Sequence, residues 1–271
     1  MVKQDLTKGF QNVDNSQHQF LIEFLEDAGR LPQVLECFEL QLKWLDIKKG
    51  NYVLDIGCGI GLQAQSMAKL VGAGGKVAGT DLSSVMIDIA KSKTASSNLP
   101  LEFFVANAIQ QPFPDQSFDC IRIERVLMYI KDIPAVLEEF KRLLKPNGKI
   151  VAFDFDWDAI VIAHTDKTLT RKIVRYVSDS FPNGRIGGEL FRYLKDAGFK
   201  DVSAKPFCYS GDNHILLDIT KRIYEGILQT GISNNIFTEK EIADWWQVLE
   251  KDVREGDFFA SFQGFIVGGT K

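Results

Sequence analysis

Apolar segments and polar, glycine-containing turns alternate through the first 155 residues, as they do where strands and helices follow one another. The run Tyr52–Ile56 is short and apolar, which is typical of a strand buried on both faces. Further strands are predicted at 76–80, 101–105, 118–123 and 149–155, with helices at 62–71, 84–97 and 133–144. Strands that alternate with helices predict an α/β fold, a parallel, doubly wound sheet with right-handed crossovers.

The segments that flank this alternating region are expected to be mainly helical. Residues 1–19 are polar and are predicted to be loose, and helices at 20–27 and 31–45 precede the first strand. After residue 157, helices are predicted at 169–180, 187–197, 212–229 and 239–254, and strands near 202–209 and 258–268. We predict one domain over residues 1–271, with an N-terminal helical cap at 1–45 and helical insertions at 157–185 and 212–255 that form a lid.

A glycine turn follows the first strand, with glycine at Gly57, Gly59 and Gly61. These residues permit a sharp turn and let a ligand lie against bare backbone. A dinucleotide fingerprint would need a small residue at Leu62, where leucine would crowd a pyrophosphate. S-adenosylmethionine (AdoMet) has no phosphate, and a carboxylate at Asp55 can hold its ammonium group. The turn therefore favours AdoMet over NAD.

Four stretches in fixed order carry a resemblance to a known family. They are VLDIGCGIG (53–61), GTDLS (79–83), ANAIQQPFPDQSFD (106–119) and RVLMYIKDIPAVLEEFKRLLKPNGKIV (125–151). Together they resemble the class I AdoMet-dependent methyltransferases, and most of all the branch that acts on small molecules, including ubiquinone/menaquinone-type enzymes. The resemblance covers about residues 45–210. It implies a Rossmann-like, seven-stranded, mostly parallel sheet whose last strand is antiparallel.

The resemblance also implies where AdoMet, and its product S-adenosylhomocysteine, would bind. Asp81 would hold the ribose hydroxyls, and Leu82 would pack on the adenine. Asn107 stands where the family often has aspartate, but its amide oxygen can still accept from the adenine amine. The expected cofactor-binding residues are Asp55, Gly57, Cys58, Gly59, Gly61, Asp81, Leu82, Met86, Asn107, Ala108, Ile109, Glu124 and Arg125.

Residues after the fourth and fifth strands are candidates for the acceptor side. The segment 153–158 alternates aromatic and acidic residues, which on a strand places the carboxylates on one face. His164 could act as a general base, although a lone loop histidine is more often structural. The catalytic candidates are His164, Asp154 and Glu124, and the expected acceptor pocket consists of Arg125, Tyr129, Asp156, Trp157 and Tyr176.

Composition narrows the classes of partner. The 271 residues carry a net charge of −4, without a Lys/Arg run interleaved with aromatics, so we expect no nucleic-acid partner. No apolar run is long enough to cross a bilayer, and the histidines are scattered, so we expect no membrane partner and no metal site. Four scattered cysteines are expected to be buried thiols in the cytoplasm.

These observations predict a cytoplasmic methyltransferase, a monomer or homodimer, that methylates an O, N or C atom of a small-molecule acceptor. One alternative is a non-catalytic AdoMet-binding or regulatory protein. Another is a methyltransferase that acts on protein or RNA, although the acidic balance of the chain disfavours RNA.

Overall fold

The computed structural model describes residues 5–16 and 18–271. Within this part, the strands are β1 (Tyr52–Ile56), β2 (Lys76–Asp81), β3 (Leu101–Val105), β4 (Phe118–Glu124), β5 (Leu144–Phe155), β6 (Val161–Ile162), β7 (Lys200–Gly211) and β8 (Ala260–Thr270). The α-helices are α1 (Leu6–Gln11), α2 (His18–Gly29), α3 (Pro32–Leu45), α4 (Leu62–Val71), α5 (Ser84–Thr94), α6 (Ile133–Leu143), α7 (Lys167–Asp179), α8 (Ile186–Asp196), α9 (His214–Ser233) and α10 (Glu239–Glu255). Short 3₁₀ turns are η1 (Val13–Asn15), η2 (Leu127–Tyr129) and η3 (Trp157–Ala159).

All eight described strands belong to one sheet, in the order β3-β2-β1-β4-β5-β8-β6, with β7 paired to β8. Strands β1 to β5 are parallel to one another, and β8 runs antiparallel to β5, β6 and β7. The predicted doubly wound sheet with an antiparallel last strand is confirmed. The two-residue strand β6 is an addition that the sequence did not predict. The strand order reverses between β1 and β4, where ligands bind in open α/β sheets.

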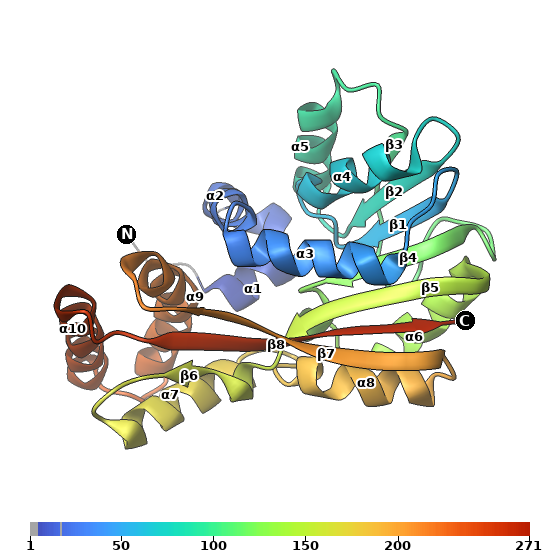
Figure 1. Ribbon diagram of the computed structural model, residues 1–271. Coiled ribbons are helices and arrows are strands. Elements are labelled where there is room, and N and C mark those ends of the chain that lie inside the picture. The colour runs from blue at the N-terminus through green and yellow to red at the C-terminus, as the bar shows by residue number, and fades with distance from the viewer. Residues whose placement is uncertain (1–4, 17) are drawn as a thin grey trace.

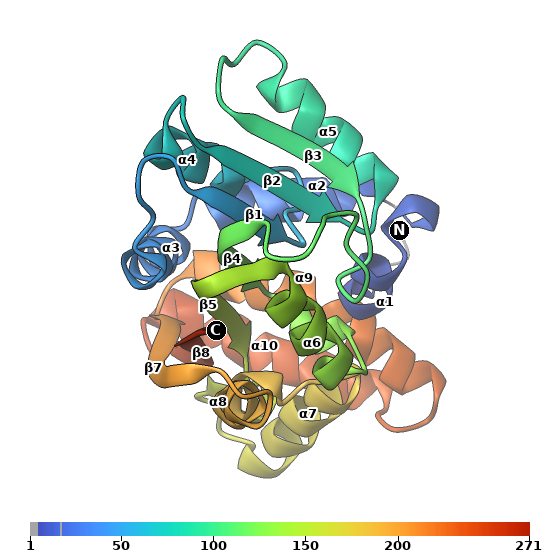
Figure 2. The same ribbon diagram turned by 90° about the vertical axis from the view of Figure 1, so that its right-hand side faces the viewer.

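Helices cover both faces of this sheet. Helices α3 and α8 lie on opposite sides of β5 and β8 (Figure 1). Helix α6 packs beside α8 (Figure 2), and its residues Val136, Leu137 and Phe140 are fully buried. This explains why β1, β4 and β5 read as nearly continuous apolar runs, because both of their faces are covered.

The prediction that residues 1–19 are loose is wrong for the part that the structure describes. Asp5 caps α1 by accepting a hydrogen bond from the Thr7 N–H at 2.9 Å, and Leu6 is buried. So short a helix is not stable alone, and α1 is held by contacts with α2 and α9. The remainder of that prediction, for residues 1–4 and 17, lies outside the described residues.

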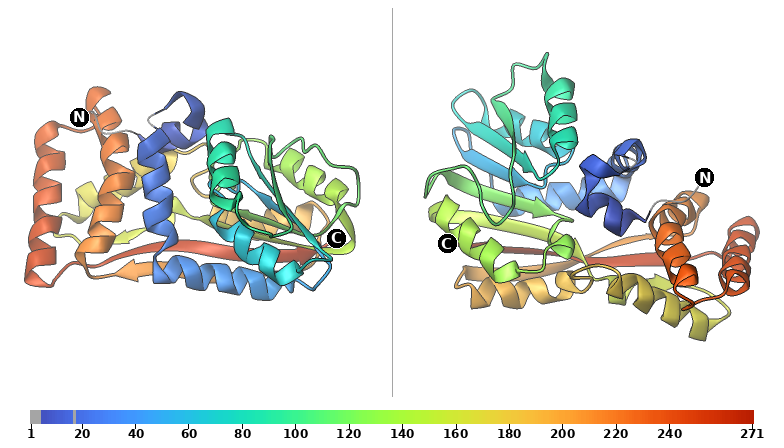
Figure 3. Two further views of the ribbon diagram at one scale, coloured as in Figure 1. Left: turned by 90° about the horizontal axis from the view of Figure 1, so that it is seen from above. Right: turned by 180° about the vertical axis from the view of Figure 1, so that it is seen from behind.

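The long strands β7 and β8 carry the C-terminal helices away from the centre of the sheet. Helices α7, α9 and α10 pack together there, and α1 and α2 lie between α9 and α5 (Figures 1 and 3). No described helix is long and apolar enough to cross a membrane. Cys37, Cys58 and Cys120 are buried thiols as predicted, whereas Cys208 is exposed, because it alternates along β7 with the buried Phe207 and Tyr209.

Candidate active site

A cavity of about 390 Å³ lies beyond the carboxyl ends of β1, β2 and β4. Its floor is the glycine turn after β1, and its wall on one side is the loop after β3. Its roof comes from the N-terminal helices, which contribute Phe10, Phe24 and Leu25. The predicted cap at residues 1–45 therefore takes part in enclosing this space, called the first cavity below.

The glycine turn has the open backbone that the sequence predicted. Gly57 and Gly59 both line the first cavity and have positive φ angles of 68° and 52°. A Cβ on Gly57 would collide with Val126, and one on Gly59 would lie 3.4 Å from Leu25. Gly61 lies outside the cavity lining and immediately precedes α4, where it lets Phe103 pack closely. Its expected contact with a cofactor is therefore replaced by a packing role.

Asp81, at the end of β2, faces the first cavity and holds the glycine turn. Its carboxylate accepts hydrogen bonds from the Gly59 N–H at 2.9 Å and from the Ser83 N–H at 3.0 Å. Burial raises the pKa of Asp81, and the N–H donors only partly offset this. Next to it, Met86 lines the cavity, and Leu82 stands at its rim with 64% of its surface exposed. The Asp81 carboxylate can therefore accept hydrogen bonds from a diol, beside the exposed apolar side chain of Leu82.

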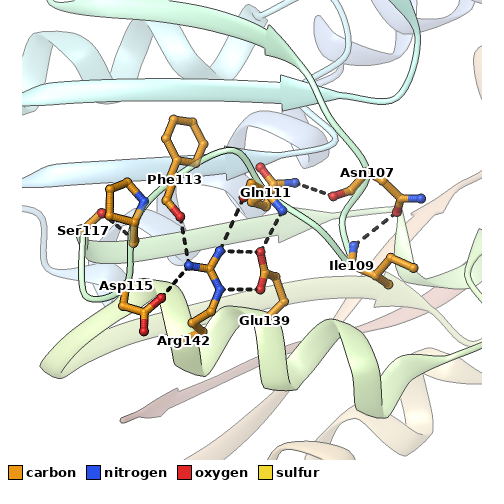
Figure 4. Close-up of polar contacts among 9 residues, drawn as sticks. Asn107, Ile109, Gln111, Phe113, Asp115, Ser117, Glu139 and Arg142 are labelled. Atoms are coloured by element: carbon orange, nitrogen blue, oxygen red, sulfur yellow. Dashed lines mark hydrogen bonds and ion pairs between the residues drawn. The ribbon is translucent and has the colours of Figure 1, made fainter.

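The loop after β3 brings Asn107 and Ala108 into the first cavity. Arg142 of α6 fixes this loop, since it donates to the Phe113 carbonyl at 2.9 Å and pairs with Glu139 (Figure 4). The Asn107 Oδ1 accepts from the Ile109 N–H at 3.2 Å and keeps a second lone pair for a ligand. Ile109 itself is half-exposed and does not line the cavity.

A buried ion network lies under the junction of β1 and β4. Arg122 donates to Asp55 at 2.8 Å and to Gln41 at 2.9 Å, and it also pairs with Glu124. Asp55 is thus buried behind Arg122 and does not line the cavity. In this arrangement it does not reach a ligand in the cavity, contrary to the prediction of a direct contact. The sequence analysis missed Arg122 and Gln41. An arginine in the middle of an apolar strand was the available signal.

The pKa values of the two carboxylates in this network, Asp55 and Glu124, are shifted in opposite directions. Burial raises the pKa of Asp55 more than Arg122 lowers it. Burial also acts to raise the pKa of Glu124, but the charges of Arg122 and Arg125 outweigh it, and the net pKa of Glu124 is lowered. A carboxylate with a lowered pKa is a weak base, which argues against Glu124 as a proton acceptor.

A second cavity, of about 240 Å³, opens next to the first. Its walls come from α2 and the start of α3, from residues after β4, from the ends of β5 and β7, from α9 and from β8. Most lining side chains are apolar or aromatic, among them Phe155, Trp157, Ile219 and Phe262. Phe24 and Arg125 line both cavities, so they form the boundary between the two spaces.

The structure separates the residues that were expected at the acceptor side. Tyr129 and Cys58 line the first cavity, and Trp157 lines the second. Asp156 accepts from the Asp158 N–H, and Tyr176 packs edge-on against Phe237, so neither lines a cavity. His164 stacks on Trp245, and its Nδ1 accepts from the Asp166 N–H at 2.9 Å. His164 is therefore in a structural position, away from both cavities.

Asp154 is fully buried at the end of β5. Its Oδ2 accepts from the Met128 N–H at 3.3 Å, and its Oδ1 has no hydrogen-bond partner among the described residues. Burial raises the pKa of Asp154 to about 7, and the N–H donors of η2 limit the rise. It lies outside both cavity linings and supports the η2 backbone that carries Tyr129.

The first cavity fits a nucleoside that carries no phosphate. It has the carboxylate of Asp81 for a ribose, the surfaces of Leu82 and Met86 for a base, and the bare Gly59 backbone between them. Its lining places two acidic side chains, Asp81 and Glu124, beside the basic Arg122 and Arg125. Among residues 5–16 and 18–271, no cluster of three His, Cys, Asp or Glu side chains could hold a metal ion.

Comparison with known proteins gives consistent matches. A family model described as a methyltransferase domain matches residues 54–152. An "Uncharacterized 37.1 kDa protein" in a Streptomyces fradiae transposon is 38% identical over 187 residues, which cover 68% of this chain and 54% of that protein. A 2-phytyl-1,4-naphtoquinone methyltransferase of Nostoc is 32% identical over 62% of this chain and 80% of its own length.

The fold also matches solved structures. Phosphoethanolamine N-methyltransferase 2 of Haemonchus contortus, solved with S-adenosyl-L-methionine, superimposes with a TM-score of 0.62 at 21% identity. The match covers 97% of this chain and 59% of that protein. At this identity the likeness shows a shared fold.

Proposed function

Because the chain belongs to the AdoMet-dependent methyltransferases, we propose that it transfers the methyl group of AdoMet to a small, apolar acceptor. The observation that carries this proposal is the pair of adjoining cavities. The first suits AdoMet, and the second offers an apolar space on the other side of Phe24 and Arg125. A methyl group at the boundary of the first cavity would face an acceptor in the second.

Asp81 would hold the ribose hydroxyls, and Leu82 and Met86 would enclose the adenine, with Asn107 at its amine. When bound, AdoMet supplies a methyl group that its sulfonium already activates. The chain's own contribution is then to orient the two ligands and exclude water. Phe10, Phe24 and Leu25 cover the first cavity, and residues of α9 cover the second.

The lining of the second cavity favours an apolar acceptor over a charged one such as phosphoethanolamine. Ligand sites for apolar molecules have mostly hydrophobic walls with few polar groups, and this cavity matches that description. The relatives include a protein named as a naphtoquinone methyltransferase, which agrees with an acceptor that contains an aromatic ring.

We further propose that the N-terminal cap and α9 form a lid over these cavities, with α7 and α10 behind it. The protein would act in the cytoplasm, as a monomer or homodimer and without nucleic acid, as its free thiols and net charge suggest.

Calorimetry and methyl transfer test this proposal. S-adenosylhomocysteine is expected to bind, whereas NAD is not. With methyl-labelled AdoMet, label is expected in reduced naphthoquinones and not in phosphoethanolamine. Binding without transfer to any acceptor in a broad panel would favour the non-catalytic alternative, and NAD binding without AdoMet binding would overturn the cofactor assignment.

A further inference from the structure

Arg125 occupies an unusual backbone position at the boundary of the two cavities. It follows directly after β4, and its φ angle is 56°, in the left-handed region that side chains other than glycine rarely adopt. Its N–H donates to the Phe153 carbonyl at 2.8 Å, which holds this conformation. Strained non-glycine residues are found most often at functional sites, because only the surrounding structure keeps them in place.

The donors of Arg125 are only partly used. Its Nε pairs with Glu124 Oε1 at 3.0 Å, while no ion pair or hydrogen bond from the described residues reaches its two terminal amino groups. The side chain is 20% exposed and lines both cavities. A guanidinium has five N–H donors, and the terminal ones remain available at the lining of both cavities. The free donors therefore point to a ligand that accepts hydrogen bonds.

None of the described residues that line the second cavity can act as a general base for its occupant. Among the described residues of this lining, Arg125 is the one charged side chain, and the other polar side chains come from Gln33, Tyr209, Ser210 and Asn213. Burial raises the pKa of the Tyr209 phenol far above neutrality, so it stays protonated. A neutral hydroxyl or amine acceptor would have no group in this space to take its proton.

We infer that Arg125 binds the methyl acceptor as an oxyanion, so that the acceptor is an aromatic or conjugated molecule with an acidic hydroxyl, such as a phenol or enol. This inference rests on the proposed methyl transfer. The hydroxyl proton leaves to bulk water, and the terminal amino groups of Arg125 donate to the oxygen that remains. The oxygen, or the carbon conjugated with it, forms a bond to the methyl carbon. The sulfur–methyl bond breaks, and its electron pair stays on sulfur, which becomes a neutral thioether.

In this arrangement the positive charge of Arg125 takes the place of a general base. An apolar cavity alone would raise the pKa of a bound phenol, because it disfavours the anion. A guanidinium within hydrogen-bonding reach favours the anion and lowers the pKa. The sign of the pKa shift of a bound phenol therefore reports whether Arg125 meets its oxygen.

The test uses 4-nitro-1-naphthol, an apolar bicyclic phenol that ionises at mildly acidic pH and whose anion absorbs visible light. Its pKa is measured by absorbance when bound to the protein saturated with S-adenosylhomocysteine. Wild type is expected to lower the bound pKa by about one unit or more, a tenfold or greater preference for the anion. Arg125→Met, which fills similar space without charge, is expected to abolish or reverse this shift, and Arg125→Lys to retain part of it.

Three controls make the result decisive. Arg30→Met removes an exposed arginine that lines neither cavity and is expected to leave the shift unchanged. The analogue 1-nitronaphthalene, which has no hydroxyl, is expected to bind wild type and Arg125→Met alike. Calorimetry with S-adenosylhomocysteine shows whether each variant keeps a folded first cavity. If wild type binds both ligands but raises the pKa of the naphthol, or if Arg125→Met lowers it equally, the inference is wrong while the proposed function stands. Failure to bind S-adenosylhomocysteine would instead refute the proposed function.

Discussion

Replacing Asp81 by alanine is expected to weaken the binding of S-adenosylhomocysteine by about 1–3 kcal/mol. The carboxylate faces the first cavity and would accept from two ribose hydroxyls. Hydrogen bonds to a charged acceptor are stronger than neutral ones, so this loss corresponds to a dissociation constant roughly 5- to 150-fold higher. Calorimetry at pH 7.5 covers this range, because it measures dissociation constants from about micromolar to about millimolar.

The variant also loses hydrogen bonds inside the protein, and the assay must separate the two effects. Asp81 accepts from the N–H groups of Gly59 and Ser83, which hold the glycine turn. A double-mutant-style cycle with the 2′,3′-dideoxy analogue of S-adenosylhomocysteine isolates the ribose contact. Asp81→Ala is expected to cost much less affinity for this analogue than for the natural ligand, because the hydroxyls are already absent.

A matched control comes from Asp88, an exposed acid on α5, since Asp88→Ala removes a carboxylate of the same type near the site. It is expected to leave the dissociation constant within twofold of wild type. Burial raises the pKa of Asp81, so this carboxylate is protonated at a higher pH than an ordinary aspartate. On acidification, the affinity for S-adenosylhomocysteine should therefore begin to fall at a correspondingly higher pH. An unchanged dissociation constant in a folded Asp81→Ala, or an equal loss for both ligands, would refute the ribose contact.

Three further predictions follow from the same geometry. Gly59→Val is expected to weaken S-adenosylhomocysteine binding more than Asp81→Ala, because its φ of 52° disfavours a branched side chain that would enter ligand space; normal affinity in calorimetry would refute close approach. The raised pKa of Asp154, about 7 against an ordinary value of 3.8, means that the native state keeps a proton between these pH values while the unfolded state loses it. The free energy of unfolding should therefore fall by up to about 4 kcal/mol as pH rises through this window, and Asp154→Asn should remove that decrease in urea titrations; equal slopes for both proteins would contradict it. In hydrogen exchange, α9 (His214–Ser233) should gain protection when S-adenosylhomocysteine and an acceptor bind, and full protection in the free monomer would rule out a lid.

The sheet and the glycine turn could be predicted because their signals are local. Tyr52–Ile56, Gly57 and Gly59 lie within eight consecutive residues, and their spacing alone describes a strand and a turn that a ligand can approach. Asp81 was found in the same way, by its place at the end of the next strand. Each of these residues acts through its own stretch of backbone.

The partner of Asp55 could not be predicted from that stretch. Its carboxylate is taken by Arg122, 67 residues further along the chain, and only the register of β1 beside β4 brings the two together. The six-residue helix α1 was missed for a related reason. Its sequence is too short and polar to predict a helix, and contacts with α9 hold it in place.

The second cavity was beyond sequence analysis for the most part. Its walls come from positions as far apart as Phe24, Trp157, Ile219 and Phe262, which share no motif. Trp157 was predicted on the alternation along its strand, but the other three are ordinary apolar residues until the fold assembles them. His164 was considered because histidine is a common general base. In the structure it stacks on Trp245, away from both cavities, so its residue type alone was weak support for a catalytic role.

The central claim is that the two cavities hold cofactor and acceptor separately, and a cavity-filling variant tests it most directly. Ala28 lines only the second cavity, so Ala28→Phe would fill part of its 240 Å³. Label transfer from methyl-labelled AdoMet to a reduced naphthoquinone is measured beside calorimetry with S-adenosylhomocysteine. The account predicts at least tenfold slower transfer with a dissociation constant for S-adenosylhomocysteine within about twofold of wild type. Undiminished transfer in Ala28→Phe, or equal loss of transfer and S-adenosylhomocysteine binding, would contradict it.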